Sequence, residues 1–196
     1  MLNEELKEVL GELINIAFGS ATATIADLFD NFATLQIPDI TWTPLEKINA
    51  FVMGSFDDQK IYVTTQQFKG LFQGETLFAI DPQSARNMQA IIGEEDEMDE
   101  NDIQESLLEI SNILGSSCIG KLAELLSTDV TFAAPSIDYN KPLIKDVNNS
   151  PYNHVIIIST ALEFKEIEIL GKLFIMVTDE MFAWLEQALT EFMENI

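Results

Sequence analysis

The chain contains two stretches in which apolar residues recur at helical spacing, one near its start and one near its middle. The first apolar stripe comprises Leu6, Val9, Leu10, Leu13, Ala17, Ala21 and Leu28. Its three- and four-residue intervals are those of an amphipathic helix. Asn3 is placed to cap this helix, with Glu4 and Glu5 in the first turn, where the helix dipole favours anions. We therefore predict a helix from about residue 3 to about residue 30.

Runs rich in β-branched and aromatic residues follow the first helix, after two prolines that break the helical pattern. These runs cover residues 48–56, 60–65 and 75–80. Their composition predicts strands, and Asp57-Asp58 between the first two runs suggests a tight hairpin. Asp81 followed by Pro82 is the pattern of an N-cap with proline at the first helical position, so a short helix should end near Ile92.

The second half of the chain repeats this order. A second helix is predicted for about residues 102–126, and three strand-like runs follow it at residues 130–137, 154–164 and 167–177. Thr178 is placed to cap a final helix that ends near Met193. The strand segments LFAI at Leu77 and LFIM at Leu173 match at a spacing of 96 residues, each just before a helix. Helix, strands and helix therefore occur twice.

This order predicts an α+β fold made of one duplicated domain with pseudo-twofold symmetry. The short turns leave no room for crossover helices, so the sheet should be mainly antiparallel, with the two repeat helices packed on one face. The repeats would span about residues 1–95 and 102–196. Residues 94–105 contain eight acidic side chains in twelve. They lack the regular ligand positions and central glycine of a calcium loop, which predicts a solvated connector.

The two helical stretches are related in sequence as well as in pattern. EVLGELINIAFGSATATIADLF starts at residue 8 and ESLLEISNILGSSCIGKLAELL starts at residue 105, a spacing of 97. The polar residues of the motif that are identical in both copies at this spacing are Glu8 and Glu105, Glu12 and Glu109, and Asn15 and Asn112. A third Glu-x-x-Asn at Glu46 and Asn49 stands outside any helical pattern, and about one such match is expected by chance. Repetition on matched helices is therefore the informative feature.

Helical geometry places each Glu-x-x-Asn pair on an exposed face. Residues three apart are surface neighbours with Cβ atoms about 5–6 Å apart. At roughly 100° per residue, both pairs point away from the apolar stripes. Small residues further along the same faces would let another backbone approach. The predicted docking face comprises Glu8, Gly19, Ala23, Glu105, Ser116 and Gly120, with Ala26 and Ala123 beyond them.

The chemistry of each pair suits a site that is shared with a second protein. An asparagine amide can accept a hydrogen bond from a water and donate one to it, and so hold that water in line for attack. A glutamate can accept a charge-assisted hydrogen bond from a partner's lysine or arginine. We therefore expect Glu12 with Asn15, and Glu109 with Asn112, to complete a site on a partner that already holds the metal and the phosphoryl group.

Composition and charge narrow the class of partner. The net charge is −23, from 33 acidic and 10 basic residues, which disfavours nucleic acid and anionic membranes as partners. No run of eighteen apolar residues and no basic leader pattern occur, so a cytoplasmic protein is expected. The single cysteine, Cys118, fits a reducing compartment and a core position. The single histidine, His154, has no companions for a metal or triad site, so we interpret it as structural.

These helices and motifs resemble the CheC/CheX/FliY family of chemotaxis phosphatases over essentially the whole chain. The family motif is an acidic residue or serine, three positions, glutamate, two positions and asparagine. It reads here from Glu8 to Asn15 and from Glu105 to Asn112. Two intact copies are most similar to the CheC branch, since CheX keeps one site per chain. FliY-type proteins carry an additional C-terminal flagellar-switch domain, for which this chain is expected to be too short.

The resemblance implies hydrolysis of the phospho-aspartate on a CheY-type response regulator. Asn15 and Asn112 would each orient the attacking water, while Glu12 and Glu109 would each pair with the regulator's active-site lysine. The Mg²⁺ would belong to the regulator, so the chain would need no metal of its own. The receptor deamidase CheD is the other partner that the family implies. The alternative is a binding module for CheD or the regulator, with slow or absent hydrolysis.

The chain departs from the family pattern beside each motif. Family members often have glycine just before the asparagine, where this chain has Ile14 and Ser111. We expect these side chains to narrow the approach of the regulator at one or both sites. Glu8 and Glu105 stand where aspartate or serine is commoner, which is a milder change.

Overall fold

The computed structural model describes residues 3–28, 33–35, 39–56, 60–92, 99–139, 144, 147–164 and 167–194. The helices are α1 (Glu4–Leu28), α2 (Ile48–Ser55), α3 (Pro82–Ile92), α4 (Glu100–Leu125) and α5 (Asp179–Glu194), with 3-10 helices η1 (Leu45–Lys47) and η2 (Val147–Asn149). The strands are β1 (Ala33–Leu35), β2 (Asp39–Pro44), β3 (Tyr62–Gly70), β4 (Gly74–Ile80), β5 (Val130–Phe132), β6 (Ser136–Tyr139), β7 (His154–Phe164) and β8 (Ile167–Val177).

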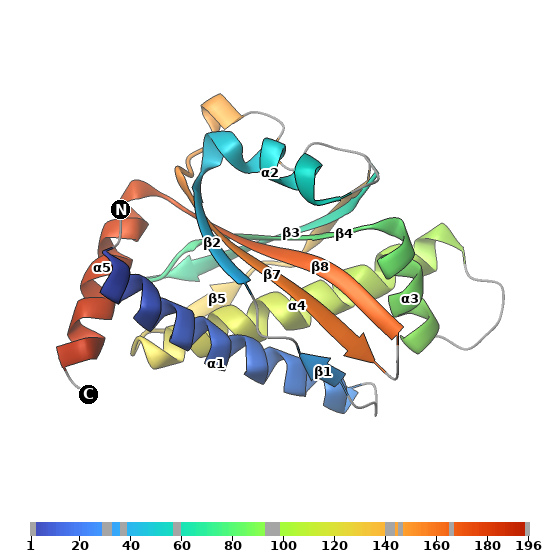
Figure 1. Ribbon diagram of the computed structural model, residues 1–196, viewed down its shortest axis with the longest axis horizontal. Helices are drawn as coiled ribbons and strands as arrows, with labels where there is room; N and C mark the ends of the chain where they lie inside the picture. The colour runs from blue at the N-terminus through green and yellow to red at the C-terminus, as the bar shows by residue number, and fades with distance from the viewer. Residues whose placement is uncertain are drawn as a thin grey trace.

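The described strands form one eight-stranded sheet in which every pairing is antiparallel. Its centre runs in the order β7, β8, β4 and β3. At one end β1 and β2 both pair with β7, and at the other β5 and β6 both pair with β3. The predicted α+β fold with a mainly antiparallel sheet is confirmed (Figure 1).

The central pair β4–β8 reveals how the two halves are related. Leu77 lies opposite Phe174, and both contribute to the same buried cluster. A twofold axis normal to the sheet at this point exchanges the two residues, which is a spacing of 97, as in the helices. A spacing of 96 would match Leu77 to Leu173, which faces the other side of the sheet. The 96-residue match is therefore wrong by one residue, because side chains alternate between faces along a strand.

The outer strands are exchanged between the halves. β2 belongs to the first half of the chain but pairs with β7 of the second, and β6 belongs to the second half but pairs with β3 of the first. Neither half has a complete sheet without the other. We propose on this basis that repeats of about 1–95 and 102–196 form one folding unit.

Helices α1 and α4 cover one face of the sheet, as predicted for the repeat helices. They lie side by side and run in opposite directions (Figure 1). Leu10 and Phe18 of α1 and Leu114 and Ile119 of α4 are fully buried in the larger core cluster. By length and composition α1 could also cross a membrane. Its apolar side packs into this core, which is the pattern of a core helix.

The opposite face is covered by α2, and the strand predicted for residues 48–56 is wrong. Ile48 and Val52, one helical turn apart, are buried together with Leu77 and Phe174 of the sheet. A short apolar run does not by itself distinguish a strand from a buried helix, so contacts with the sheet decide. Residues 57–58, the predicted hairpin, lie outside the described residues.

The helix starts are fixed by the predicted caps and by one that was missed. Asn3 Oδ1 accepts a hydrogen bond from the Leu6 amide at 2.8 Å, and Asp81 Oδ1 accepts from the Ser84 amide at 2.9 Å. Asp99 and Asp102 form a capping box at the start of α4. The end of the acidic run 94–105 is therefore helix rather than connector, while residues 93–98 lie outside the described part of the chain.

Candidate functional site

The first Glu-x-x-Asn pair lies on the outer face of α1. Glu8 and Glu12 are exposed, as predicted, and so are Gly19 and Ala23 further along. Asn15 is half-buried, although the sequence predicted an exposed side chain. Its Oδ1 atom is fully buried and has no hydrogen-bond partner among the described residues. The carboxylates of Glu8 and Glu12 are therefore available to a partner, whereas no described residue holds the Asn15 amide oxygen.

The second pair lies on the matching face of α4. Glu105, Glu109 and Asn112 are all exposed, and Ser116 and Gly120 are half-buried. Ala123, expected at the end of the same face, is 1% exposed and belongs to the core. The docking face on α4 is thus shorter than the sequence predicted. The polar pair itself is more open than the pair on α1.

Asn112 has a partner that sequence reasoning missed. Gln66 on β3 donates from Nε2 to Asn112 Oδ1 at 2.7 Å, and the same nitrogen donates to the Ala133 carbonyl at 3.0 Å. Gln66 is 4% exposed and lies between Thr64 and Phe68 on the face that α4 covers. A glutamine at an inward position of an otherwise buried strand was the available signal in the sequence.

Contact between α4 and β3 depends on a small residue at position 115. A Cβ added to Gly115 would lie 2.9 Å from Gln66 Oε1 and 3.3 Å from Thr76 Oγ1. Glycine therefore lets the helix backbone approach the two polar side chains of the sheet closely. Tyr62, also on β3, donates to Glu100 at 2.7 Å and fixes the first turn of α4. Burial, followed by this hydrogen bond, raises the pKa of Tyr62 above its ordinary value.

The corresponding positions beneath α1 are apolar. At the spacing of 97, Phe18 replaces Gly115 and Leu173 replaces Thr76. Leu173 lies opposite Ile158 just as Thr76 lies opposite Gln66, so Ile158 is the counterpart of Gln66. All three apolar side chains belong to the main core cluster. The first site therefore packs on apolar side chains of the sheet, and the second packs on polar ones.

The residues that precede each asparagine do not face a partner. Ile14 is 0% exposed and Ser111 is 5% exposed. The Ser111 hydroxyl donates to the Leu108 carbonyl of its own helix at 3.1 Å. The prediction that these side chains narrow the approach of a regulator is wrong. They lie about 100° around the helix from the asparagine and point into the core.

Other polar candidates have structural surroundings. Within the described ranges, no three His, Cys, Asp or Glu side chains gather as possible metal ligands. Cys118 is buried, which raises the pKa of its thiol to about 12, so it is a core residue as predicted. His154 stacks on Phe182 and pairs with Asp179 at 2.7 Å. Asn49 of the third Glu-x-x-Asn bonds the Ile144 backbone through both amide atoms, at 3.2 and 3.3 Å.

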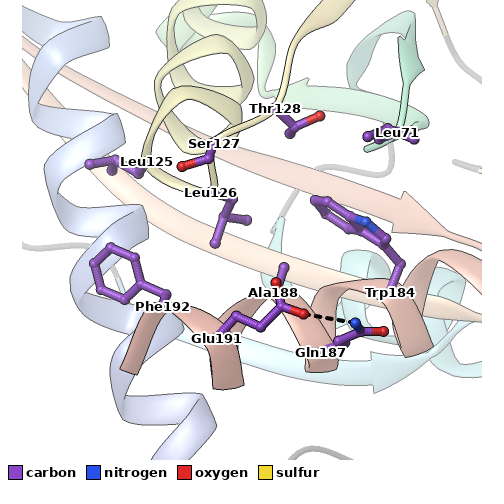
Figure 2. A pocket seen from close by; sticks show the side chains of 10 residues that line it. All are labelled: Leu71, Leu125, Leu126, Ser127, Thr128, Trp184, Gln187, Ala188, Glu191 and Phe192. Carbon is purple, nitrogen blue, oxygen red and sulfur yellow. Dashed lines mark hydrogen bonds between the residues drawn. The ribbon is translucent and has the colours of Figure 1, made fainter. Parts of the chain in front are cut away.

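A groove at the end of α4 is separate from both pairs. It is lined by Leu71, Leu125, Leu126, Ser127, Thr128, Trp184, Gln187, Ala188, Glu191 and Phe192 (Figure 2). Gln187 and Glu191 are hydrogen-bonded to each other across one helical turn at 2.8 Å. No Glu-x-x-Asn residue lines this groove. Its walls are part polar and part apolar, and they bring no acid–base or nucleophilic constellation together.

Solved structures with this fold include FliY, the FliM middle domain and the chemotaxis protein CheX. Thermotoga maritima FliY is similar over 98% of this chain and 99% of that chain, with a TM-score of 0.77 and 17% identity. The FliM middle domain of Vibro alginolyticus has a TM-score of 0.65 and 11% identity, over 90% of this chain and 98% of that chain. CheX from Desulfovibrio desulfuricans has a TM-score of 0.53 and 13% identity, over 83% of this chain and 98% of that chain. At such identities the likeness establishes the fold alone.

The sequence itself matches a family model. No curated protein matches the chain. The model described as "Chemotaxis phosphatase CheX" matches residues 62–159, which is half of the chain. The matched segment contains Gln66, Glu109 and Asn112 and begins after α1. The exposed Glu-x-x-Asn pair on α4 and the shared fold agree with this match. Because the match covers half of the chain, the chain belongs to the CheX family of chemotaxis phosphatases.

Proposed function

We propose that the protein accelerates hydrolysis of the phospho-aspartate on a CheY-type response regulator. The observation that supports this most is the exposed pair Glu109 and Asn112 on α4, within the segment that matches the family model. The pair on α1 repeats it with Glu12 and Asn15. Both helices lie side by side on one face of the sheet, so a partner can approach either outer surface.

Each residue type has a defined task in this proposal. The asparagine amide holds a water in line with the phosphorus, and the glutamate accepts a charge-assisted hydrogen bond from the regulator's active-site lysine. The regulator supplies the Mg²⁺ that neutralises charge on the phosphoryl group, and the protein supplies none. The side chains of this protein therefore complete an active site that the regulator already holds. A cytoplasmic location and membership of the CheC branch belong to the same proposal.

The test is release of phosphate from a phosphorylated CheY-type regulator in the presence of Mg²⁺. The wild-type protein should accelerate release, and the double variant Asn15→Ala with Asn112→Ala should not. Asn101→Ala is a matched control, because Asn101 is an exposed asparagine in the first turn of α4. Full acceleration by the double variant would contradict the proposed mechanism.

A binding module for the regulator or for CheD is the second candidate. The buried and unpartnered Oδ1 of Asn15 favours it for the first site, since that amide is not set to hold a water. This candidate predicts a stable complex that survives loss of both asparagines. Isothermal titration of the double variant with the regulator, and separately with CheD, distinguishes binding alone from hydrolysis.

A further inference from the structure

The second site contains a buried side chain, Gln66, that donates a hydrogen bond to the exposed Asn112. We infer that Gln66 is a positioning residue, which fixes the Asn112 amide for water and makes the second site the pre-oriented one. This inference rests on the proposed function. Its geometric basis is the 2.7 Å bond from Gln66 Nε2 to Asn112 Oδ1, which has no counterpart at Asn15.

The direction of both amides follows from one backbone group. The Ala133 carbonyl can only accept a hydrogen bond, so the Gln66 end that lies 3.0 Å from it must be the NH₂ group. The second hydrogen of that group points at Asn112, whose oxygen must therefore face the sheet. One lone pair of Oδ1 and both Nδ2 hydrogens remain for a water on the exposed side. The two hydrogen bonds that link Ala133, Gln66 and Asn112 thus allow one orientation of each amide.

Burial makes this bond hard for water to break. Gln66 is 4% exposed, and a hydrogen bond in such surroundings is stronger than one at the surface. Without the bond, the terminal torsion of an exposed asparagine has a broad distribution. A held amide removes that freedom before the regulator arrives, which is the entropic part of catalysis by positioning.

Gln66 is unfavourable for stability at its buried position, so its presence is not explained by packing. Gln66 Oε1 is buried and has no partner among the described residues. A buried amide oxygen left without a partner is unfavourable, and an apolar side chain of similar size would avoid that cost. The second half of the chain has such a side chain, Ile158, at the place equivalent to Gln66. A costly residue that contacts the exposed asparagine is the pattern of a functional position.

The experiment isolates the second site by working in an Asn15→Ala background. There, Gln66→Leu should lower the single-turnover rate of phosphate release about tenfold at saturating regulator, because the amide is no longer held. The concentration of regulator that gives half-maximal rate should change less than about twofold, since Glu109 still binds. In an Asn112→Ala background the same Gln66→Leu change should alter neither value.

Each remaining outcome has a meaning. An unchanged rate for Gln66→Leu in the Asn15→Ala background would overturn the inference. An equal loss in the Asn112→Ala background would also overturn it, because the effect would then be general. If Gln66→Leu does not fold, Gly115→Ala replaces it, since the added Cβ would meet Gln66 Oε1 at 2.9 Å, with Gly11→Ala as the matched control. Activity that survives loss of both asparagines would instead refute the proposed function.

Discussion

The two Glu-x-x-Asn sites differ less at the surface than beneath it. Each motif exposes its two glutamates, and both helices lie on the same face of one sheet. Under α4 the contact is polar, through Gln66 and Gly115, whereas under α1 it is apolar, through Ile158 and Phe18. The comparison teaches that a duplicated surface motif can be kept while its support diverges. One copy then gains an oriented amide and the other gains core packing.

This division is consistent with the different demands on the two helices. Fully buried Phe18 contributes hydrophobic free energy to the core, which a glycine at position 115 does not. Gly115 instead permits the close contact that places Gln66 beside Asn112. We therefore interpret the contact beneath α1 as core packing and α4 as the helix that presents the oriented site.

The largest expected effect tests the stabilising role of α1. Phe18→Ala should lower the free energy of unfolding by about 3–5 kcal/mol, because a fully buried aromatic side chain is lost and a cavity remains. Urea unfolding followed by circular dichroism measures it. A loss below about 1 kcal/mol would show that the apolar support of the first site is not important to the core.

A smaller effect tests the close approach at α4. Gly115→Ala should lower the free energy of unfolding by about 1–3 kcal/mol, because the new methyl overlaps Gln66. Gly11→Ala, where the methyl meets only the Ile40 side chain at 4.0 Å, should raise it by about 0.5–1 kcal/mol through helix propensity. Opposite signs for the two variants in urea unfolding support the comparison, and equal signs contradict it.

The smallest effect concerns the other face of the sheet, where Glu75 and Lys172 are counterparts at the spacing of 97. Burial raises the pKa of the Glu75 carboxyl above 4.5, and hydrogen bonds from Gln67 and Tyr152 offset part of the rise. The folded state therefore binds this proton more tightly than the unfolded state, so ionised Glu75 is destabilising above its folded-state pKa.

Glu75→Gln should accordingly raise the melting temperature slightly at pH 7. The difference should shrink as the pH falls through the raised folded-state pKa and vanish once the pH is below 4.5, where the unfolded state is protonated too. Thermal scans of wild type and variant across this range measure it. A gain that persists at the acidic end would show that charge is not its cause.

Much of the fold could be predicted from periodicity and caps. The apolar stripes of α1 and α4 are long, and Asn3, Asp81 and Thr178 each accept a bond from an amide near the start of the helix that follows. The helix α2 could not be predicted, because a short run of eight mostly apolar residues suits either a strand or a helix. Strands β1 and β2 were also missed, since their pairing with β7 is a long-range contact.

The candidate site was predictable in part for a similar reason. The exposed carboxylates follow from helical spacing, which is local. Gln66 lies forty-six positions from Asn112, so their hydrogen bond required the sheet register. The error at Ile14 and Ser111 came from judging distance along the chain rather than rotation around the helix, since both are buried.

The most direct test of the account compares the two asparagines singly. Phosphate release from a phosphorylated regulator should be slowed more by Asn112→Ala than by Asn15→Ala, because Gln66 orients Asn112 and nothing in the described structure holds the oxygen of Asn15. The account predicts that Asn15→Ala retains most of the acceleration. A larger loss for Asn15→Ala than for Asn112→Ala would contradict it.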